Sequence, residues 1–134
     1  EQIETLESGV NTIEKRHYLG NYAVLTHKDT TKQLHYQHRD RLGSVSLVTK
    51  GYLHLDDSGA AALLYERRGY DVFGKPRDEF WGDSLDGKLA SASSPRGFTD
   101  HEHLDGVEII HMNGRGFDYN LGRFLSVDPF IQFP

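Results

Sequence analysis

Three tight-turn signals crowd into the segment from Pro95 to Phe130, and they constrain the fold of this chain more than any other feature. They are Asp105-Gly106, Asn113-Gly114 and Asn120-Leu121-Gly122. Apolar or aromatic residues flank each signal, so the chain has to reverse direction repeatedly over a short distance. The segment therefore predicts a β-meander, in which successive antiparallel strands are joined by short turns.

Two earlier units of the chain carry the same kind of signal. In the first, a turn signal at Asp40-Arg41-Leu42-Gly43 separates two runs with the period-2 alternation of strands. The alternating residues are Leu34, Tyr36 and His38 against Gln33, His35 and Gln37, then Val45 and Leu47 against Ser44 and Ser46. The second unit turns at Asp57-Ser58-Gly59 and ends with Gly69-Tyr70-Asp71-Val72-Phe73-Gly74. We therefore predict an all-β fold, built from antiparallel hairpin repeats that form a twisted, curled sheet.

Composition limits the functions that such a chain can have. With 134 residues the chain is one domain at most. The net charge is −5 and basic residues form no stripe along the sequence, which argues against nucleic-acid binding. No apolar run approaches the length of a membrane span, and no signal peptide opens the sequence. Because the chain has no cysteine, disulfides, thiolate catalysis and cysteine-ligated zinc are excluded.

Several spaced motifs closely resemble the Rhs-associated core domain, the closing section of bacterial Rhs and YD-repeat proteins. The two earlier units are similar to the YD repeat, in which an Asp-x-x-Gly turn joins paired strands; in the first unit these residues are Asp40 and Gly43. The matching pieces of the core signature are Arg96-Gly97-Phe98-Thr99, His101-Glu102, Ile110-His111-Met112-Asn113-Gly114-Arg115, Leu121-Gly122-Arg123-Phe124-Leu125 and Asp128-Pro129.

The resemblance also implies an organisation for the chain. Residues 1–77 are expected to form degenerate YD/Rhs-type hairpin repeats, and residues 96–134 the core signature segment. Residues 78–95 break the pattern with further turn signals and a run of Ser and Ala, so they are expected to be an exposed loop or insertion. One departure from the family is Asp100, which stands where the family has glycine; if that position has a positive φ, an aspartate adopts it at some cost.

The function that the resemblance implies is structural. The chain would be part of a hollow shell that encloses or presents a C-terminal toxin, used in competition between bacteria or against hosts. Its partners would be the remainder of the shell and the toxin, with self-association through strand edges and with neither nucleic acid nor a membrane span. The protein would be bacterial, and cytoplasmic until it is secreted or delivered by a secretion system such as type VI. No cofactor is implied.

Asp128 is the one catalytic candidate. In Rhs proteins that release their toxin by self-cleavage, the aspartate of a motif similar to Ser126-Val127-Asp128-Pro129 resembles one half of an aspartyl-protease-like pair. The second aspartate comes later in the family, in an Asp-Pro-x-Gly stretch that this sequence does not contain. Because such a mechanism needs two carboxylates, we expect this chain alone to be inactive. The alternative role for Asp128 is that of a turn residue before proline. Arg115 and Arg123 flank the last hairpin and could form ion pairs with Asp118 or Asp128.

A cluster of histidines raises a metal-site alternative. His101, His103 and His111 lie close together in the sequence with Glu102 and Asp105 between them, and His101 and His103 would share one face of a strand. The cluster has neither the HExxH spacing nor cysteine, so it matches no defined metal geometry. Histidines with hydrogen-bond partners or facing solvent are the alternative interpretation.

Two rival functions remain open at this stage. One is an enzyme, either an autoproteolytic fragment or a small metal-dependent domain that uses the histidine cluster. The other is a carbohydrate- or surface-binding β module, suggested by the aromatic residues Tyr18, Tyr22, Phe80 and Trp81. Serine nucleophiles have little support, because none of the serines stands in a Gly-x-Ser-x-Gly elbow; those considered are Ser44, Ser46, Ser91, Ser93 and Ser94.

Overall fold

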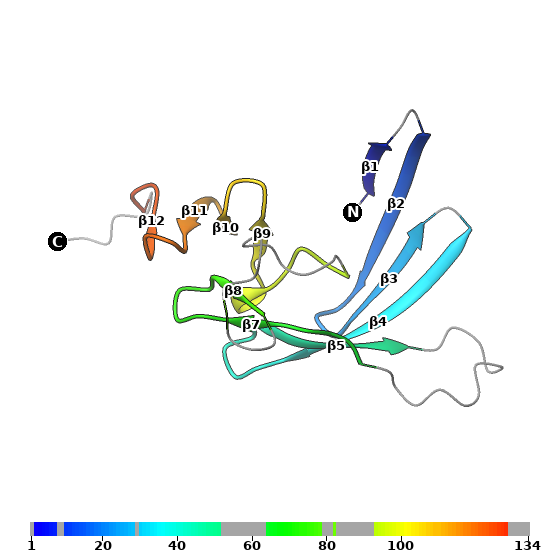
Figure 1. The fold of residues 1–134 in the computed structure, drawn as a ribbon, viewed down its shortest axis with the longest axis horizontal. Coiled ribbons are helices and arrows are strands. Elements are labelled where there is room, and N and C mark those ends of the chain that lie inside the picture. Colours follow the sequence, from blue (N-terminus) through cyan, green and yellow to red (C-terminus); the bar gives the residue numbers. More distant parts are fainter. Residues whose placement is uncertain are drawn as a thin grey trace. The chain divides into compact units, whose positions relative to one another are not determined.

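The computed structural model describes residues 2–7, 10–28, 30–51, 64–78, 82 and 93–128; of residues 2–7 and 10–12 it describes the backbone only. Within these residues the chain is nearly all β, with antiparallel sheets (Figure 1). The one helical element of this part is a 3-10 turn at Phe98–Asp100, η1. The predicted all-β fold with antiparallel hairpins is therefore confirmed. No helix in the described part of the chain is long and apolar enough to cross a membrane.

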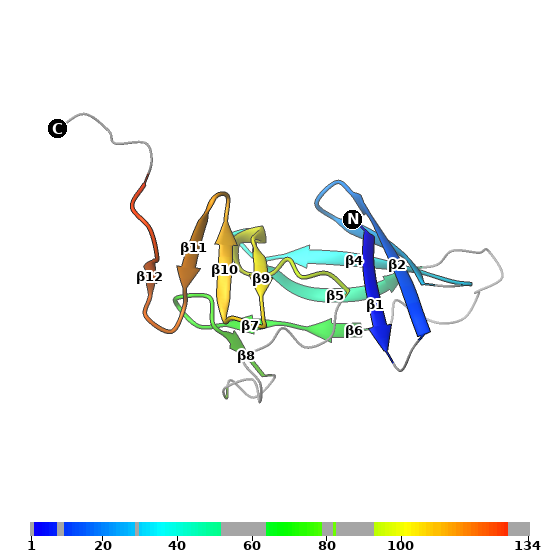
Figure 2. The same ribbon diagram turned by 90° about the horizontal axis from the view of Figure 1, so that it is seen from above.

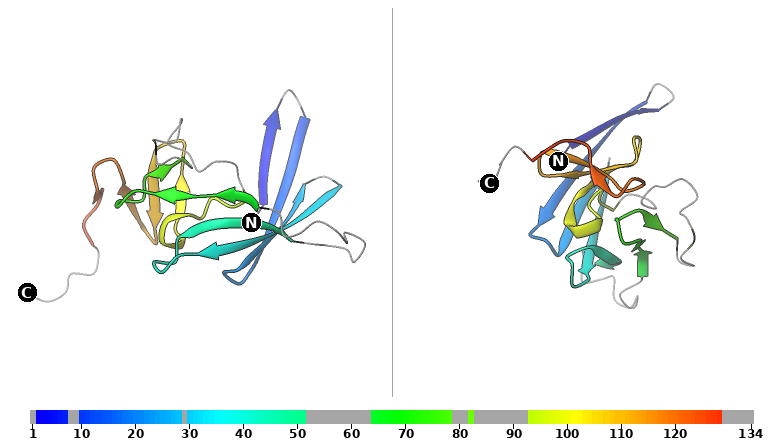
Figure 3. Two further views of the ribbon diagram at one scale, coloured as in Figure 1. Left: turned by 60° about the horizontal axis from the view of Figure 1, so that its bottom comes forward. Right: turned by 90° about the vertical axis from the view of Figure 1, so that its left-hand side faces the viewer.

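The chain divides into two compact units, and the first comprises residues 1–39 and 46–67. Its described strands form one six-stranded sheet in which each strand pairs with the next in sequence. Figure 3 shows the first two strands side by side. The strands are β1 (Gln2–Glu7), β2 (Val10–Leu19), β3 (Ala23–Lys28), β4 (Thr31–Arg39), β5 (Val45–Gly51) and β6 (Leu64–Arg67). Short connections explain the order of the first five strands, since a two- to five-residue link brings each new strand beside the previous one.

The side chains of β4 alternate between two faces as predicted, and the buried face carries the polar residues of the pattern. His35 is 2% exposed and Gln37 is 6% exposed, whereas Tyr36 between them is 40% exposed. The His35 ring stacks against Tyr65 with ring centroids 4.2 Å apart. Burial, reinforced by the positive charge of Lys50, lowers the pKa of His35, which therefore stays neutral at pH 7. The alternating pattern predicts which residues share a face of the strand, but not which face is covered.

The second unit comprises residues 40–45 and 68–134. It contains a short hairpin of β7 (Gly69–Tyr70) and β8 (Pro76–Arg77), and a four-stranded meander whose strands lie side by side in chain order (Figure 2). The meander consists of β9 (Glu102–Leu104), β10 (Ile109–Met112), β11 (Arg115–Asp118) and β12 (Arg123–Phe124).

The turn signals of the core segment are confirmed. Residues 105–108, 113–114 and 119–122 connect the four strands of the meander in the predicted places. Asn113 and Gly114 both have positive φ, 47° and 103°, as a two-residue hairpin turn that follows the twist of its strands requires. The turn predicted at Asp57-Ser58-Gly59 lies outside the described residues.

The Asp-x-x-Gly turn occurs twice with the same set of hydrogen bonds. In residues 40–44, Oδ1 of Asp40 accepts from the backbone N–H groups of Leu42 and Ser44, at 2.8 and 2.9 Å. In residues 71–75, Oδ1 of Asp71 accepts from the corresponding N–H groups of Phe73 and Lys75, also at 2.8 and 2.9 Å.

The backbone hydrogen bonds of the two turns also correspond. The glycine N–H donates to the carbonyl oxygen of the aspartate, at 3.0 Å in the first turn and 3.1 Å in the second. Gly43 and Gly74 both have positive φ, 82° and 89°. The turn at residues 40–44 thus recurs in the motif that closes the second sequence repeat, and in both places a carboxylate satisfies N–H groups that the strands leave unpaired.

Two parts of the chain differ from the sequence expectations. The sequence from His17 to Lys28 predicts a strand with Tyr18, Tyr22 and Val24 on one side, but the structure has a hairpin in this run. Gly20, with φ of 61°, reverses the chain, so Tyr22 lies in the turn and Tyr18 faces Val24 across the two strands. The end of the segment expected to be exposed, residues 78–95, also differs: Ser93 and Ser94 are buried, because they line the interior of the second unit.

The sequence also did not indicate which segments of the chain belong to the same compact unit. The structure groups residues 40–45 and 68–77 with the core signature segment in the second unit, whereas the sequence placed them among the hairpin repeats of residues 1–77. Hydrogen bonds between residues far apart in the sequence cause this grouping, and local patterns contain no information about them.

Alanine substitutions at the two turn glycines distinguish the free-energy cost of backbone strain from the cost of close packing. A Cβ at Gly43 would meet nothing within 4 Å, whereas a Cβ at Gly74 would lie 2.6 Å from the Phe98 ring and 2.8 Å from Ile110. We expect Gly43→Ala to cost about 1–2 kcal/mol through its positive φ. We expect Gly74→Ala to cost about 1–3 kcal/mol more, because the ring and the Ile110 side chain must move. Urea unfolding of both variants gives the comparison, and equal losses would contradict it.

Candidate functional site

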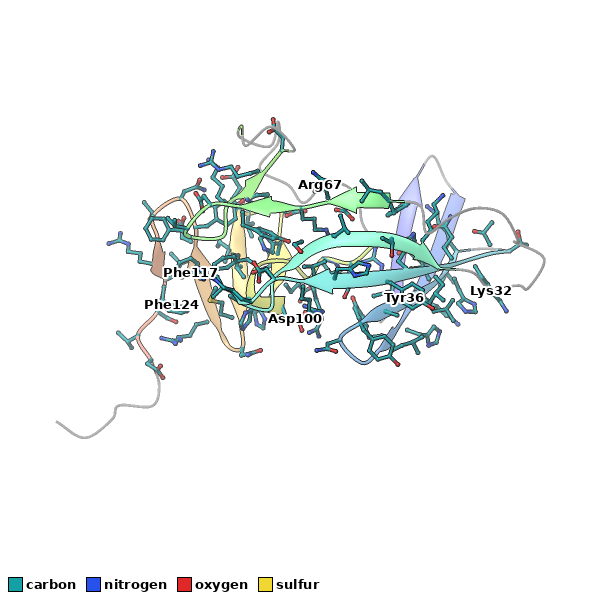
Figure 4. All side chains as sticks on the ribbon, turned by 90° about the horizontal axis from the view of Figure 1, so that it is seen from below. Lys32, Tyr36, Arg67, Asp100, Phe117 and Phe124 are labelled. Atoms are coloured by element: carbon teal, nitrogen blue, oxygen red, sulfur yellow. The ribbon has the colours of Figure 1, made fainter. Side chains whose placement is uncertain are left out.

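The second unit is organised around one cross-strand row of the meander. His103, Ile110, Phe117 and Phe124 are direct partners on β9, β10, β11 and β12, so their side chains share one face of the sheet. Burial decreases along the row: Ile110 is fully buried, and Phe124 is 38% exposed. The Phe117 and Phe124 rings, labelled in Figure 4, meet edge to face at 5.2 Å (Figure 4). The β9 end of the row is therefore the core of this unit.

Aromatic rings surround the buried end of this row. The Tyr70 ring lies 5.8 Å from Phe98 and 5.7 Å from His103, and the Tyr119 ring lies 6.4 Å from His103. Tyr119 is buried, and that burial, reinforced by the carboxylates of Glu108, Asp105 and Asp118, raises its pKa to about 12. Tyr119 is therefore a neutral phenol at pH 7.

His103 is a buried, neutral acceptor in this core. His103 is 4% exposed. Its Nε2 accepts a hydrogen bond of 3.1 Å from the backbone N–H of Phe98. Burial, followed by the positive charges of Arg68 and His101, lowers the pKa of His103 to about 4. Since the Nε2 lone pair is already engaged by Phe98, His103 stabilises the backbone here and does not face a substrate as a base.

The loop that His103 binds has an unfavourable backbone conformation. Thr99 and Asp100 both have left-handed φ, 48° and 62°. A residue other than glycine in this region costs about 1–3 kcal/mol, and it persists only where the surroundings impose it. The cost expected for aspartate at the family's glycine position is therefore present, and Thr99 adds a second one.

Hydrogen bonds from several segments impose this conformation. The backbone N–H of Thr99 donates to Ser44 Oγ at 3.0 Å, and the backbone N–H of Val45 donates to the Gly97 carbonyl oxygen at 3.1 Å. The Tyr70 hydroxyl donates to the Val45 carbonyl oxygen at 2.9 Å. A Cβ at Gly97 would lie 2.8 Å from both His103 Nε2 and the Tyr70 oxygen, so only glycine fits there. Three separate stretches of chain meet at this point.

Arg68 secures the far side of the same loop. Its guanidinium donates to the carbonyl oxygen of Arg96 at 2.6 Å and to Ser93 Oγ at 3.0 Å. Arg68 and Ser93 are both buried. Hydrogen bonds from a buried charged group are strong and expensive to break, so Arg68 holds the 93–96 segment in place.

Asp128 lies at the exposed end of the meander. Its Oδ2 is 3.2 Å from an Arg115 guanidinium nitrogen, and its side chain is half exposed. The Arg115 guanidinium also lies over the Phe124 ring, 3.9 Å from its centroid. Of the ion pairs that the sequence left open for Arg115 and Arg123 with Asp118 or Asp128, the structure shows the one between Arg115 and Asp128.

The structure separates the three candidate metal ligands. His101 precedes β9, and its Nδ1 lies 2.8 Å from Thr99 Oγ1; His103 points into the core. His111 is exposed on β10, on the opposite face from His103, because its register partner is Glu102. His101 and His103 do not form one ligand pair. Within the described residues no three His, Asp or Glu side chains come together in a way that could hold a metal ion.

The other candidate residues are also dispersed or structural. Ser44, Ser93 and Ser94 are buried and serve as hydrogen-bond partners of the backbone or of Arg68. Of the aromatic residues that suggested a binding surface, Tyr22 is 60% exposed and Tyr18 is half-buried. Phe80, Trp81 and Ser91 lie outside the described residues.

Sequence reasoning missed the residues that build the core of this unit. Arg68, Tyr70 and Gly97 make its key contacts, and Tyr70 and Gly97 were noted only as parts of motifs. The one available signal was Gly97 between Arg96 and Phe98, since a glycine among large residues often marks a close backbone approach.

Comparisons with known proteins identify no relative of this chain. No protein-family model matches it, and neither a curated protein nor a solved structure matches it.

The ion pair of Asp128 predicts a small stability effect. Asp128→Asn removes the charge and keeps the size of the side chain, and exposed ion pairs contribute less than about 1 kcal/mol. We expect Asp128→Asn to change the free energy of unfolding by less than that amount. Arg115→Ala should cost more, because it also removes the contact with Phe124. Urea unfolding at two salt concentrations measures both; a large loss in Asp128→Asn would show that the carboxylate has further structural partners.

Proposed function

We propose that this chain is a structural segment of an Rhs-type shell that encloses or presents a C-terminal toxin. The observation that carries this proposal is the repeated turn at Asp40–Ser44 and Asp71–Lys75, with matching hydrogen bonds 31 residues apart (71 minus 40). Each turn joins two paired strands, as in the YD repeat that the sequence resembles. The first turn joins β4 to β5 of the six-stranded sheet and the second joins β7 to β8, so the same turn builds successive hairpins of a repeat array.

The arrangement of strands supports the same proposal. In the described part of the first unit every strand pairs with its sequence neighbour, so β1 and β6 end the sheet with edges open to further pairing. A free-standing protein usually protects such edges, whereas a shell segment uses them to join the segments on either side. The remainder of the shell and the enclosed toxin are therefore the proposed partners, and self-association through these edges is the expected behaviour of the isolated chain.

The chemistry of the second unit is also that of a scaffold. Its buried polar groups hold backbone segments together, and within the described residues no cluster of ligands could bind a metal. An aspartyl-type self-cleavage half-site at Asp128 remains the second proposal. It is favoured by the position of Asp128 at the exposed end of the meander, where a second carboxylate from elsewhere could reach it.

Protease accessibility in the complete protein tests the shell proposal. Ile110 is fully buried in the meander, so Ile110→Asp should unfold the second unit and open the shell. The domain that follows this chain should then be digested rapidly, whereas it resists digestion in the unaltered protein. Val107→Asp is the matched control, because Val107 lies in the adjacent turn and is 62% exposed. Rapid digestion of that domain in the unaltered protein would refute the proposal of an enclosed toxin.

The cleavage proposal has a separate test. In a longer form of the protein that carries a downstream Asp-Pro-x-Gly stretch, Asp128→Asn should abolish self-cleavage, because asparagine cannot exchange the proton that a carboxylate pair passes. Asp118→Asn is the control: Asp118 ends β11 of the same meander, and an amide oxygen can still accept from Asn120 and Leu121. Denaturing gels at neutral and mildly acidic pH follow the reaction. Cleavage that persists in Asp128→Asn removes this residue from the mechanism.

A further inference from the structure

The loop from Gly97 to His101 is held in a strained conformation by a small number of hydrogen bonds. Thr99 and Asp100 are both left-handed, so the loop would relax if it were released. Its bonds to the rest of the second unit include Phe98 N–H to His103 Nε2, Thr99 N–H to Ser44 Oγ, and Val45 N–H to the Gly97 carbonyl oxygen. Of these acceptors, only the His103 nitrogen changes its hydrogen-bonding role between pH 4 and 7.

Protonation of His103 is incompatible with this geometry. A proton on Nε2 would face the N–H of Phe98 across 3.1 Å, so two donors would oppose each other where one bond existed. A Cβ at Gly97 would already lie within 2.8 Å of Nε2, which shows how closely the backbone approaches the ring. The second ring nitrogen, Nδ1, is buried with no hydrogen-bond partner in the part of the chain that the structure describes. An imidazolium here would gain no compensating acceptor from these contacts.

We propose that His103 is an acid-sensitive switch: its protonation releases the strained 97–101 loop and so uncouples residues 40–45 from the meander. The release is cooperative, because Gly97, Phe98 and Thr99 all bond through the same short loop. Loss of the Phe98 bond removes one of the interactions that hold Thr99 and Asp100 in their left-handed conformation, so the strain of these residues then favours release of the loop. This inference concerns the second unit alone and does not depend on the proposed function.

The charged groups around His103 favour release. Arg68 precedes β7 and His101 lies in the loop itself, and both act against a positive charge on His103. The Tyr70 and Tyr119 rings flank the His103 ring. The carboxylates of the neighbouring turns, Asp105, Glu108 and Asp118, act on Tyr119.

The direction of the effect follows from the pKa of His103. Burial first, and then Arg68 and His101, lower that pKa from 6.5 to about 4 in the folded state. The released ring binds protons more tightly than the buried one, so acid favours release. The stabilisation is complete above about pH 6.5 and is lost as the pH falls toward 4. Between pH 7.5 and 5 the equilibrium for opening should rise on the order of 30-fold.

Hydrogen exchange in the complete chain tests the switch. The backbone amides of Phe98, Thr99 and Val45 should lose protection together between pH 7.5 and 5, after correction for intrinsic exchange. In His103→Gln the side-chain oxygen can still accept from Phe98 but takes up no proton, so protection of these amides should become nearly independent of pH. His101→Gln is the matched control, since it changes a histidine of the same loop that does not bond Phe98, and it should keep the pH dependence.

Two results would overturn the proposal. One is a pH dependence in His103→Gln as steep as that of the unaltered protein. The other comes from NMR of the His103 ring protons in the unaltered protein. This measurement remains possible if His103→Gln does not fold. A ring that titrates near pH 6.5 while the amide of Phe98 stays protected would show that protonation does not release the loop. A ring that titrates well below 6.5, in step with the loss of amide protection, supports it.

Discussion

One hydrogen bond joins the meander directly to the strained loop of the second unit: the Phe98 backbone N–H donates to Nε2 of the buried His103. Together with the bonds of the loop to Ser44 and Val45, it holds the left-handed Thr99 and Asp100 in place. A neutral imidazole is suited to this role because it is flat enough to pack against Tyr70 and still offers an acceptor inside an apolar core. The same property makes the core sensitive to acid.

Carboxylates have the corresponding role in the turns. Asp40 and Asp71 each accept two backbone N–H groups in turns of the same geometry, and Asp118 accepts from Asn120 and Leu121. Short strands leave backbone N–H groups at a chain reversal without a partner in the strand ladder, and at these three turns an aspartate carboxylate accepts them.

Much of the candidate site was beyond sequence reasoning, for identifiable reasons. The turns at residues 105–108, 113–114 and 119–122 were predictable, because turn chemistry is local. The hairpin at Gly20 was missed because a strand-like alternation continues through it. The histidines at positions 101, 103 and 111 are close in sequence, yet one faces Thr99, one enters the core and one lies on the opposite face of the sheet. Strand alternation separates His103 from His111 only when the register of β9 against β10 is known.

The sequence by itself determined the all-β class, the antiparallel pairing of neighbours and the positions of most described turns, because these follow from contacts between residues a few positions apart. Only the tertiary structure decided that β4 buries His35 and Gln37, that Arg68 reaches Ser93 and Arg96, and that residues 40–45 belong with the core signature segment. Those features rest on which face of a strand is covered and on hydrogen bonds between segments 25 or more residues apart. A local pattern carries no information about either, since the same alternation is compatible with burial of either side.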